Sequence, residues 1–403
     1  MEWKEVRLGD VCTKITDGSH FSPKAQTEGY PMLSVKDMRE YDFDFSNCKK
    51  ISYEDYLKME RDGCVPQIGD VLVAKDGSYL KEIFRCKEQR EIALLSSIAI
   101  FRPNSQLIDS RFLCYCLKSP RVYNYISLNC VSGSALPRII LKDFKGVNIR
   151  VPSLDDQRRI ASILSSLDRK IELNNKMNAD LEEMAQAIFK NWFVDFEPFK
   201  DGKFVDSELG MIPEGWKVGT LGDITKNKSA KVKEKNDVKV LSPVTTGELV
   251  LSEEYFTKQV FSSSIAKYKI VNKGEFAYNP ARVNIGSLGR NEFDFDGCVS
   301  PVYVVFSVLE GYENYFDLFR KTDFFKDSVA SLAIGGVRQS LSYDDLSLIE
   351  TIIPSENIVE KFNNLYNQMK KTIKANKQEN SRLSLLRDTL LPRLMSGELE
   401  VPE

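Results

Sequence analysis

The chain has 403 residues, of which 42% are hydrophobic and 28% are charged. This composition is typical of a globular protein with two to four domains, and it excludes collagen-like, mucin-like and wholly disordered proteins. The 56 Lys and Arg residues nearly balance the 58 Asp and Glu residues, and the resulting net charge of −2 argues weakly against a nucleic-acid-binding protein. Local basic patches matter more than this sum.

The chain shows no sign of a targeting segment, a membrane span or a metal site. Its first ten residues carry five charges, and its longest nearly apolar stretch, residues 93–101, is too short to cross a bilayer. The eight cysteines are scattered, and His20 is the only histidine. We therefore expect a cytoplasmic protein with free thiols. The single histidine and the absence of glycine-rich phosphate or cofactor motifs also argue against an enzyme.

The sequence repeats itself. A Trp-Lys pair followed by Leu-Gly-Asp occurs at positions 3–10 and again at 216–223. A Gly-acid pair leading into an apolar run occurs at 69–72 and again at 274–277. A Val/Ile-Pro-Ser triplet occurs at 151–153 and again at 353–355. The separation between matching blocks shrinks along the chain, which indicates small insertions in loops of the first copy.

Each copy begins with a mixed region of strands and short helices. β-Branched and aromatic runs bounded by turn residues predict strands, and amphipathic patterns predict helices between them. We expect strands at residues 71–74, 98–101, 147–151, 276–278 and 302–308, and helices at 110–117 and 312–319. The chain is therefore expected to be α+β.

Each copy then continues into a long heptad pattern. From Ile160 to Trp192, steps of alternately four and three residues follow an a/d seam for more than four heptads. The same steps taken from Phe362 give a second seam that ends at Leu394. The polar exceptions in the two seams are Asn174, Asn178, Asn376, Asn380 and Arg387. Two such helices in one chain favour pairing with each other.

The sequence resembles the specificity (S) subunits of type I restriction–modification systems over nearly its whole length. The resemblance rests on the duplicated domain–helix order and on several local blocks. The most specific block runs from Trp-Phe-Val-Asp-Phe-Glu-Pro-Phe at 192–199 to Ile-Pro-Glu-Gly-Trp at 212–216. Others are Ile-Thr-Asp-Gly-Ser-His at 15–20 and Leu-Pro-Arg-Leu-Met-Ser-Gly-Glu-Leu at 391–399.

This resemblance implies two pseudo-symmetric α/β target recognition domains, each reading one half of a split, asymmetric site in double-stranded DNA. An antiparallel coiled coil of the two long helices would separate them. The implied boundaries are 1–151 and 216–353 for the domains, 152–197 and 354–396 for the spacer helices, 198–215 for a linker and 397–403 for a C-terminal tail.

The resemblance also implies partners. Two modification (methyltransferase) subunits and further restriction (motor-nuclease) subunits would dock on the chain, without any membrane. S-adenosylmethionine, ATP and Mg²⁺ would belong to those partners, and the chain itself would be non-catalytic and bind no cofactor.

Three segments at equivalent places in each copy carry the candidate DNA contacts. Lysines suit phosphates, whereas Arg and Asn side chains can read guanine and adenine edges. In the first copy the candidates are Lys14, Thr16, Ser19 and His20, then Lys75, Ser78 and Lys81, then Arg138. In the second they are Lys226, Lys228 and Lys231, then Tyr278, Asn279, Arg282, Asn284 and Ser287, then Arg338 and Gln339. The alternative is that these segments are solvated loops and turns with no ligand.

The asparagines predict a register mark. If the helices pack antiparallel about their centres, Asn174 faces Asn380 and Asn178 faces Asn376. Such a polar layer costs stability relative to leucine but penalises slipped registers.

Two other functions stay open at this point. One is a scaffold whose tandem domains bind proteins rather than DNA. The other is a methyltransferase or nuclease acting alone, although Asn-Pro-Ala-Arg at 279–282 only partly matches the Asn-Pro-Pro-aromatic motif of DNA amino-methyltransferases.

Overall fold

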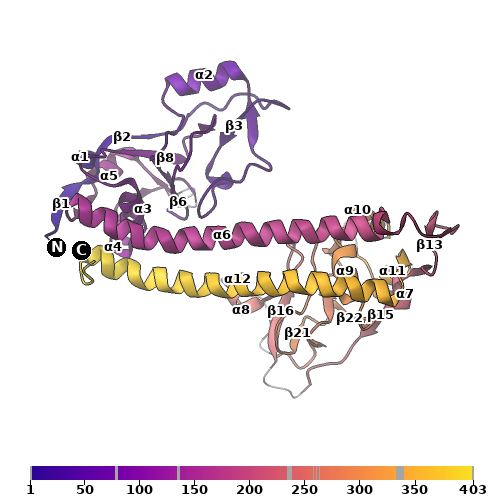
Figure 1. Ribbon diagram of the computed structural model, residues 1–403. Helices are drawn as coiled ribbons and strands as arrows, with labels where there is room; N and C mark the ends of the chain where they lie inside the picture. The colour runs from indigo at the N-terminus through magenta and orange to yellow at the C-terminus, as the bar shows by residue number, and fades with distance from the viewer. Residues whose placement is uncertain are drawn as a thin grey trace. The chain divides into compact units, whose positions relative to one another are not determined.

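The computed structural model describes residues 2–77, 80–133, 137–233, 238–256, 258–259, 261–262, 264–332 and 340–401. The chain forms two compact units, Met1–Met177 with Ala375–Glu403, and Asn178–Lys374. Each unit contains one mixed domain and one segment from each of two long helices, α6 (Leu154–Phe193) and α12 (Glu356–Ser396) (Figure 1). The expected α+β class is confirmed. No helix among the described residues is both long and apolar enough to span a membrane.

The domain of the first unit is built on two small sheets. The main sheet has the antiparallel order β2-β8-β5-β6, and the second has the order β4-β3-β7, in which β3 and β7 are parallel. A separate ribbon pairs β1 with β11 just before α6 begins. The elements are β1 (Lys4–Arg7), α1 (Leu8–Val11), β2 (Cys12–Asp17), β3 (Tyr30–Leu33), β4 (Lys49–Ile51), α2 (Tyr53–Arg61), β5 (Val71–Ala74), β6 (Ile83–Arg85), β7 (Ala93–Leu94), β8 (Ile98–Pro103), α3 (Ser110–Lys118), α4 (Pro120–Asn129), β9 (Val131–Ser132), β10 (Arg138–Ile139), α5 (Leu141–Gly146) and β11 (Asn148–Val151).

The domain of the second unit repeats this plan. Its main sheet, β15-β22-β19-β20, matches β2-β8-β5-β6 strand for strand, and β16 pairs with β21 in parallel as β3 does with β7. The elements are β14 (Lys217–Thr220), α7 (Leu221–Ile224), β15 (Thr225–Lys228), β16 (Lys239–Pro243), β17 (Leu249–Leu251), α8 (Ser252–Tyr255), β18 (Lys269–Val271), β19 (Phe276–Tyr278), a short 3-10 turn (Val283–Ile285), β20 (Leu288–Arg290), β21 (Gly297–Val299), β22 (Val304–Val308), α9 (Glu313–Phe319), α10 (Asp323–Leu332), α11 (Tyr343–Ser347) and β23 (Glu350–Ile353). The segment between α6 and β14 holds a 3-10 turn (Glu197–Phe199) and the β12 (Phe204–Val205) and β13 (Ile212–Pro213) ribbon. The sequence repeat is therefore a structural repeat.

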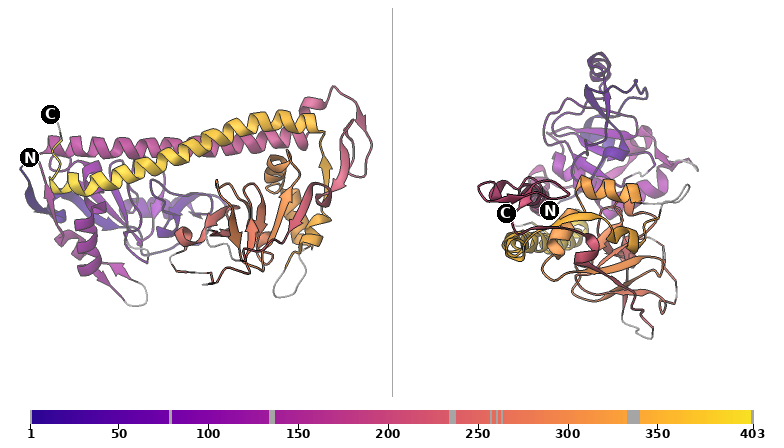
Figure 2. Two further views of the ribbon diagram at one scale, coloured as in Figure 1. Left: turned by 90° about the horizontal axis from the view of Figure 1, so that it is seen from below. Right: turned by 90° about the vertical axis from the view of Figure 1, so that its right-hand side faces the viewer.

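In each unit the domain packs against the paired helices (Figure 2). In the first unit, Ile160 and Leu164 of α6 share one buried cluster with Leu394 of α12 and with aromatic residues of the domain. In the second unit, Phe189 and Phe362 belong to the equivalent cluster. Residues of the a/d seam thus contribute both to the contact between the helices and to the buried cluster on which each domain packs.

The helices run antiparallel. In the first unit, Lys170 of α6 pairs with Glu379 of α12, and Asp168 of α6 pairs with Arg387 of α12. A lower residue number on α6 thus meets a higher one on α12. All the predicted positions of both seams are buried or half-buried. Amphipathic spacing therefore decided this part of the fold.

Candidate nucleic-acid interface

The three candidate segments of the first unit meet at Lys75. Its Nζ atom lies 3.2 Å from Oδ2 of Asp17, at the end of β2, and 3.2 Å from Oδ1 of Asp76. The amide of Gly77 donates a 2.8 Å hydrogen bond to the Pro137 carbonyl, just before β10. Residues far apart in the chain are thereby joined into one surface at the end of the main sheet.

Lys75 itself is not displayed on that surface. Its side chain is only 7% exposed and lies between two carboxylates. A buried cation with two acidic partners stabilises the loops instead of facing a ligand. The prediction that Lys75 contacts DNA is therefore corrected: its side chain holds the contact loops together.

Among the other predicted residues of this unit, three present their polar ends to solvent. His20 is 76% exposed and 3.3 Å from Asp17, Lys81 is 73% exposed, and Arg138 is exposed on β10. The remaining three are tied to the backbone: Lys14 donates to the Gly63 carbonyl, Thr16 makes a long contact with the Asp17 carbonyl, and Ser19 closes a turn onto Phe21. Ser78 lies outside the described residues.

Removing the Lys75 cation tests whether its ion pairs with Asp17 and Asp76 hold the loops together. Lys75→Met keeps most of the side-chain volume but leaves two carboxylates close together with little solvent. We expect the chain to lose about 3 kcal/mol of stability, because breaking a buried ion pair leaves uncompensated charge. Thermal unfolding of the full chain measures this loss. Lys24→Met, at an exposed position of the same domain, is the control, and equal melting temperatures for both variants would contradict the role.

In the second unit, the lysines lie on a strand. We expected a loop after residue 223, but Lys226 and Lys228 belong to β15, whose pairing with β22 extends the chain there. Lys226 is exposed, Lys228 is half-buried 3.9 Å from Glu275, and Lys231 is exposed beyond the strand. The edge strand therefore presents a row of cations.

The 278–287 loop has an interior and an exterior. Tyr278 is fully buried and donates to the Leu341 carbonyl (3.2 Å), and Ser287 is buried and donates to the Pro243 carbonyl (2.8 Å). The half-buried Asn279 accepts a hydrogen bond from the Ala281 amide (3.1 Å). These three side chains shape the loop, which corrects our expectation that Tyr278 and Ser287 face DNA.

Arg282 and Asn284 form the exterior of this loop, and both are exposed. The turn between them and β20 needs Gly286, whose φ is +92° and whose missing Cβ would lie 2.8 Å from the Thr245 carbonyl oxygen. Burial raises the pKa of Tyr303, and the positive charge of Arg282 opposes this rise. Arg338 and Gln339 lie outside the described residues.

Two of the seam asparagines form the contact that the register argument predicts. The Nδ2 atom of Asn174 donates to Oδ1 of Asn380 (2.9 Å) and to Glu379 (2.7 Å), and Asn174 is completely buried. Asn178 is 6% exposed and Asn376 half-buried. The role of the four residues in fixing register stays a prediction.

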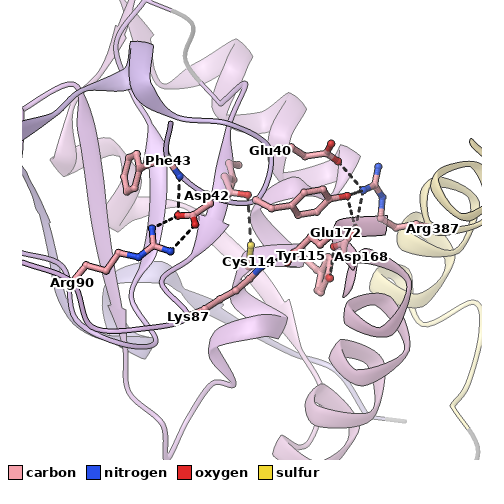
Figure 3. A network of polar contacts seen from close by, with 12 residues as sticks. Glu40, Asp42, Phe43, Lys87, Arg90, Cys114, Tyr115, Asp168, Glu172 and Arg387 are labelled. Carbon is pink, nitrogen blue, oxygen red and sulfur yellow. Dashed lines mark hydrogen bonds and ion pairs between the residues drawn. The ribbon is translucent and has the colours of Figure 1, made fainter. Parts of the chain in front are cut away.

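A polar network that the sequence did not reveal ties the first domain to both helices (Figure 3). Arg387 of α12 donates to Asp168 of α6 (2.8 Å), to Glu40 (2.9 Å) and to the Tyr41 hydroxyl (2.8 Å). The Tyr115 hydroxyl of α3 donates to the other oxygen of Asp168 (2.5 Å). Burial raises the pKa of Tyr115, and Asp168 raises it further, so this phenol stays protonated as a donor.

The described part of the chain contains no cluster of His, Cys, Asp and Glu that could hold a metal ion. The eight cysteines are free thiols, and burial raises the pKa of Cys116 to about 12.

The fold and the convergent loops define a class of protein: a tandem repeat of two loop-bearing α+β domains, each seated on a pair of antiparallel helices. Comparison with known proteins identifies the family. A family model described as the type I restriction modification DNA specificity domain matches residues 1–183. The MjaIX specificity subunit of Methanocaldococcus jannaschii, a type I restriction enzyme component, is 33% identical over 308 residues, covering 73% of this chain and 70% of the relative. The chain belongs to the family of type I restriction enzyme specificity subunits.

Two full-length comparisons agree. The HindI specificity subunit of Haemophilus influenzae is 24% identical over 485 residues, covering 99% of this chain and 100% of that protein. The crystal structure of the S subunit of a type I restriction–modification system from M. genitalium superposes with a TM-score of 0.59 at 15% identity, covering 100% of this chain and 97% of that one. This second likeness shows that the fold is shared.

Proposed function

We propose that this chain is the DNA-reading subunit of a type I restriction–modification complex, and that each domain reads one half of a bipartite, asymmetric site. The observation that carries the proposal is the convergence of three segments on Lys75, with His20 and Arg138 exposed beside it and Lys81 exposed further along the loop after β5. Imidazole, ammonium and guanidinium donors suit phosphate oxygens and base edges.

In the second domain the proposed contacts divide into two kinds. Lys226 and Lys231 place positive charge on and beyond the edge strand, which suits phosphates. Arg282 and Asn284 stand on an ordered turn, and both have the donors and acceptors for bidentate contacts to a base pair. We propose that the strand positions the DNA and the turn reads it.

This division predicts two different phenotypes. Arg282→Ala should cost about 1–3 kcal/mol of binding free energy and relax specificity at one position of the site, because a bidentate contact to a base is lost. Lys226→Ala should weaken binding to all sequences alike and reduce the salt dependence by about one charge. Binding titrations at several salt concentrations and sequencing of methylated sites measure both effects.

Lys273→Ala is the matched control for these two variants. Lys273 is an exposed cation at the turn before β19, whereas the reading loop follows β19, so it lies at the other end of that strand. We expect its substitution to change neither specificity nor salt dependence. If Arg282→Ala, like Lys273→Ala, changes neither specificity nor salt dependence, the loop has a purely structural role.

We further propose that catalysis lies in partner subunits. Two methyltransferase subunits would supply S-adenosylmethionine chemistry, and restriction subunits would supply ATP- and Mg²⁺-dependent cleavage, while this chain contributes recognition. The test compares the chain alone, the methyltransferase subunits alone and the assembled complex for methyl transfer to DNA. Site-specific transfer only by the complex supports the proposal. A complex that assembles but neither binds nor methylates DNA would instead favour the protein-binding scaffold.

A further inference from the structure

The two long helices carry opposite charges where each touches its own domain. α6 presents Asp168 and Glu172, one helical turn apart. When α6 and α12 are aligned from their first residues, Lys370 and Lys374 of α12 take the places of these two acids. Two positions that hold acids on α6 thus hold lysines on α12.

In the first unit the domain meets the acidic positions with donors. The Tyr115 hydroxyl bonds to Asp168 at 2.5 Å, and the Lys87 ammonium pairs with Glu172 (Figure 3). Lys87 follows β6, and Tyr115 lies on α3, so two separate segments of the domain contribute. The domain also brings Glu40 to this site, where it shares Nη1 of Arg387 with Asp168.

In the second unit the polarity is reversed. Glu292 pairs with Lys370, and Oδ2 of Asp294 accepts from Lys374 at 3.0 Å. Glu292 and Asp294 follow β20, the counterpart of β6, so they occupy the place of Lys87 in the repeat. The domain supplies the acids here and the helix supplies a cation to each, while Lys273 of the domain is a second partner of Asp294.

The buried tyrosine contact is reversed as well. Asp317 on α9 occupies the place of Tyr115 in the repeat, is 5% exposed, and accepts a hydrogen bond from Tyr366 of α12 at 3.3 Å. Burial raises the pKa of Asp317, but the charges of Arg320, Lys321 and Lys370 outweigh burial and leave it below its ordinary value. A contact between a tyrosine and a carboxylate thus joins domain and helix in both units, with the carboxylate on the helix in the first unit and on the domain in the second. The helical partners are one turn apart in the alignment, because Tyr366 corresponds to Leu164.

Arg387 fits the same pattern. It departs from the apolar seam because it faces Asp168, the buried acid of the first unit, at 2.8 Å. The residue of α6 at the equivalent place is Ala185, which belongs to the apolar cluster that contains Tyr366. Arg387 thus lies in the unit that contains the buried acid Asp168, whereas the second unit has alanine at the equivalent seam position.

We propose that this reversed polarity determines which domain packs against which helix. It would keep the first domain from packing against α12 in place of the second, and the second from packing against α6 in place of the first. The second domain on α6 would place Glu292 and Asp294 against Asp168 and Glu172, and Asp317 beside Leu164, one helical turn before Asp168. The first domain on α12 would place Lys87 against Lys374. Opposed like charges are unfavourable, most of all where the carboxylates are buried. The inference concerns assembly of the chain and does not depend on the DNA-reading function.

The test reverses the charge of α12 in two backgrounds. The change is Lys370→Asp with Lys374→Glu, made in the native chain and in a full-length chimera with residues 3–151 in place of residues 216–353. In the native chain the change opposes carboxylates of the second domain, and we expect the melting temperature to fall by about 2–4 °C. In the chimera it recreates the acids that the first domain meets on α6, and the melting temperature should rise. A shift of the same sign in both backgrounds would overturn the proposal.

Two further variants keep the result interpretable. Lys361→Asp with Lys371→Glu changes the same charge at exposed positions of α12, and should shift both backgrounds alike. If the chimera does not fold, the native chain with the α12 reversal receives Glu292→Lys and Asp294→Lys. Recovery of the melting temperature supports pairing by charge, and no recovery contradicts it.

Discussion

Replacing the first domain with the corresponding domain of another specificity subunit is expected to change one half of the recognised site and leave the other half unchanged. The three loops that carry His20, Lys81 and Arg138 are all built from residues within 1–151 and are joined through Lys75. The second domain builds its sheets and loops from residues within 216–353, and two of its buried clusters lie wholly in that range. We therefore expect readout by one domain to need no residue of the other.

The donor domain for this exchange should carry a cation and a phenol at the places of Lys87 and Tyr115, so that it fits the acidic positions of α6. Sequencing of methylated sites in cells with the exchanged chain and its methyltransferase reports both halves at once. If both halves of the motif change together, independent reading by two domains is wrong.

Arg387→Ala is expected to cause one of the largest losses of stability among single substitutions in the first unit. Asp168 and Arg387 have side chains only 10% and 15% exposed, so removing the guanidinium leaves a carboxylate with little solvent. Removing one partner of a buried pair costs about 3–5 kcal/mol. Tyr115 still donates to Asp168, which places the expected value near the lower end of that range.

Thermal or urea unfolding of the full chain measures this loss. Arg169→Ala, an exposed arginine next to Asp168 in the sequence, is the control and should change stability by less than about 0.5 kcal/mol. Arg387→Lys keeps the charge but loses the forked donors, so we expect an intermediate value. A loss for Arg387→Ala no larger than the control would show that the network in Figure 3 contributes little.

The regular parts of this fold could be predicted from the sequence because their signals are local or periodic. The a/d spacing from Ile160 to Trp192 and its copy from Phe362 to Leu394 predicted both long helices and the faces they bury. β-Branched and aromatic runs predicted strands such as β5 and β19 at their observed positions. The contact between the first asparagine of one seam and the last of the other followed from seam geometry, since an antiparallel pair centred on both helices allows few other partners.

The candidate site was harder to predict, because burial of a polar residue depends on distant partners. The sequence around Lys75 predicts an exposed loop cation. In the structure its side chain is buried in an ion pair with Asp17, which lies on a strand much earlier in the chain. Tyr278 and Ser287 read as contact residues, but carbonyl groups from distant segments hold them inside the loop. Arg387 was visible only as an exception in the seam, because its partner Asp168 lies on the other long helix.

The measurement that tests the central claim most directly is sequencing of methylated DNA from cells that carry this chain with its methyltransferase subunits, compared with cells in which the chain is deleted. We predict one asymmetric motif, with two specified blocks separated by an unspecified gap, that disappears with the deletion. Methylation that is unchanged by the deletion, or a motif made of one uninterrupted block, would contradict a role for this chain as a two-domain DNA reader.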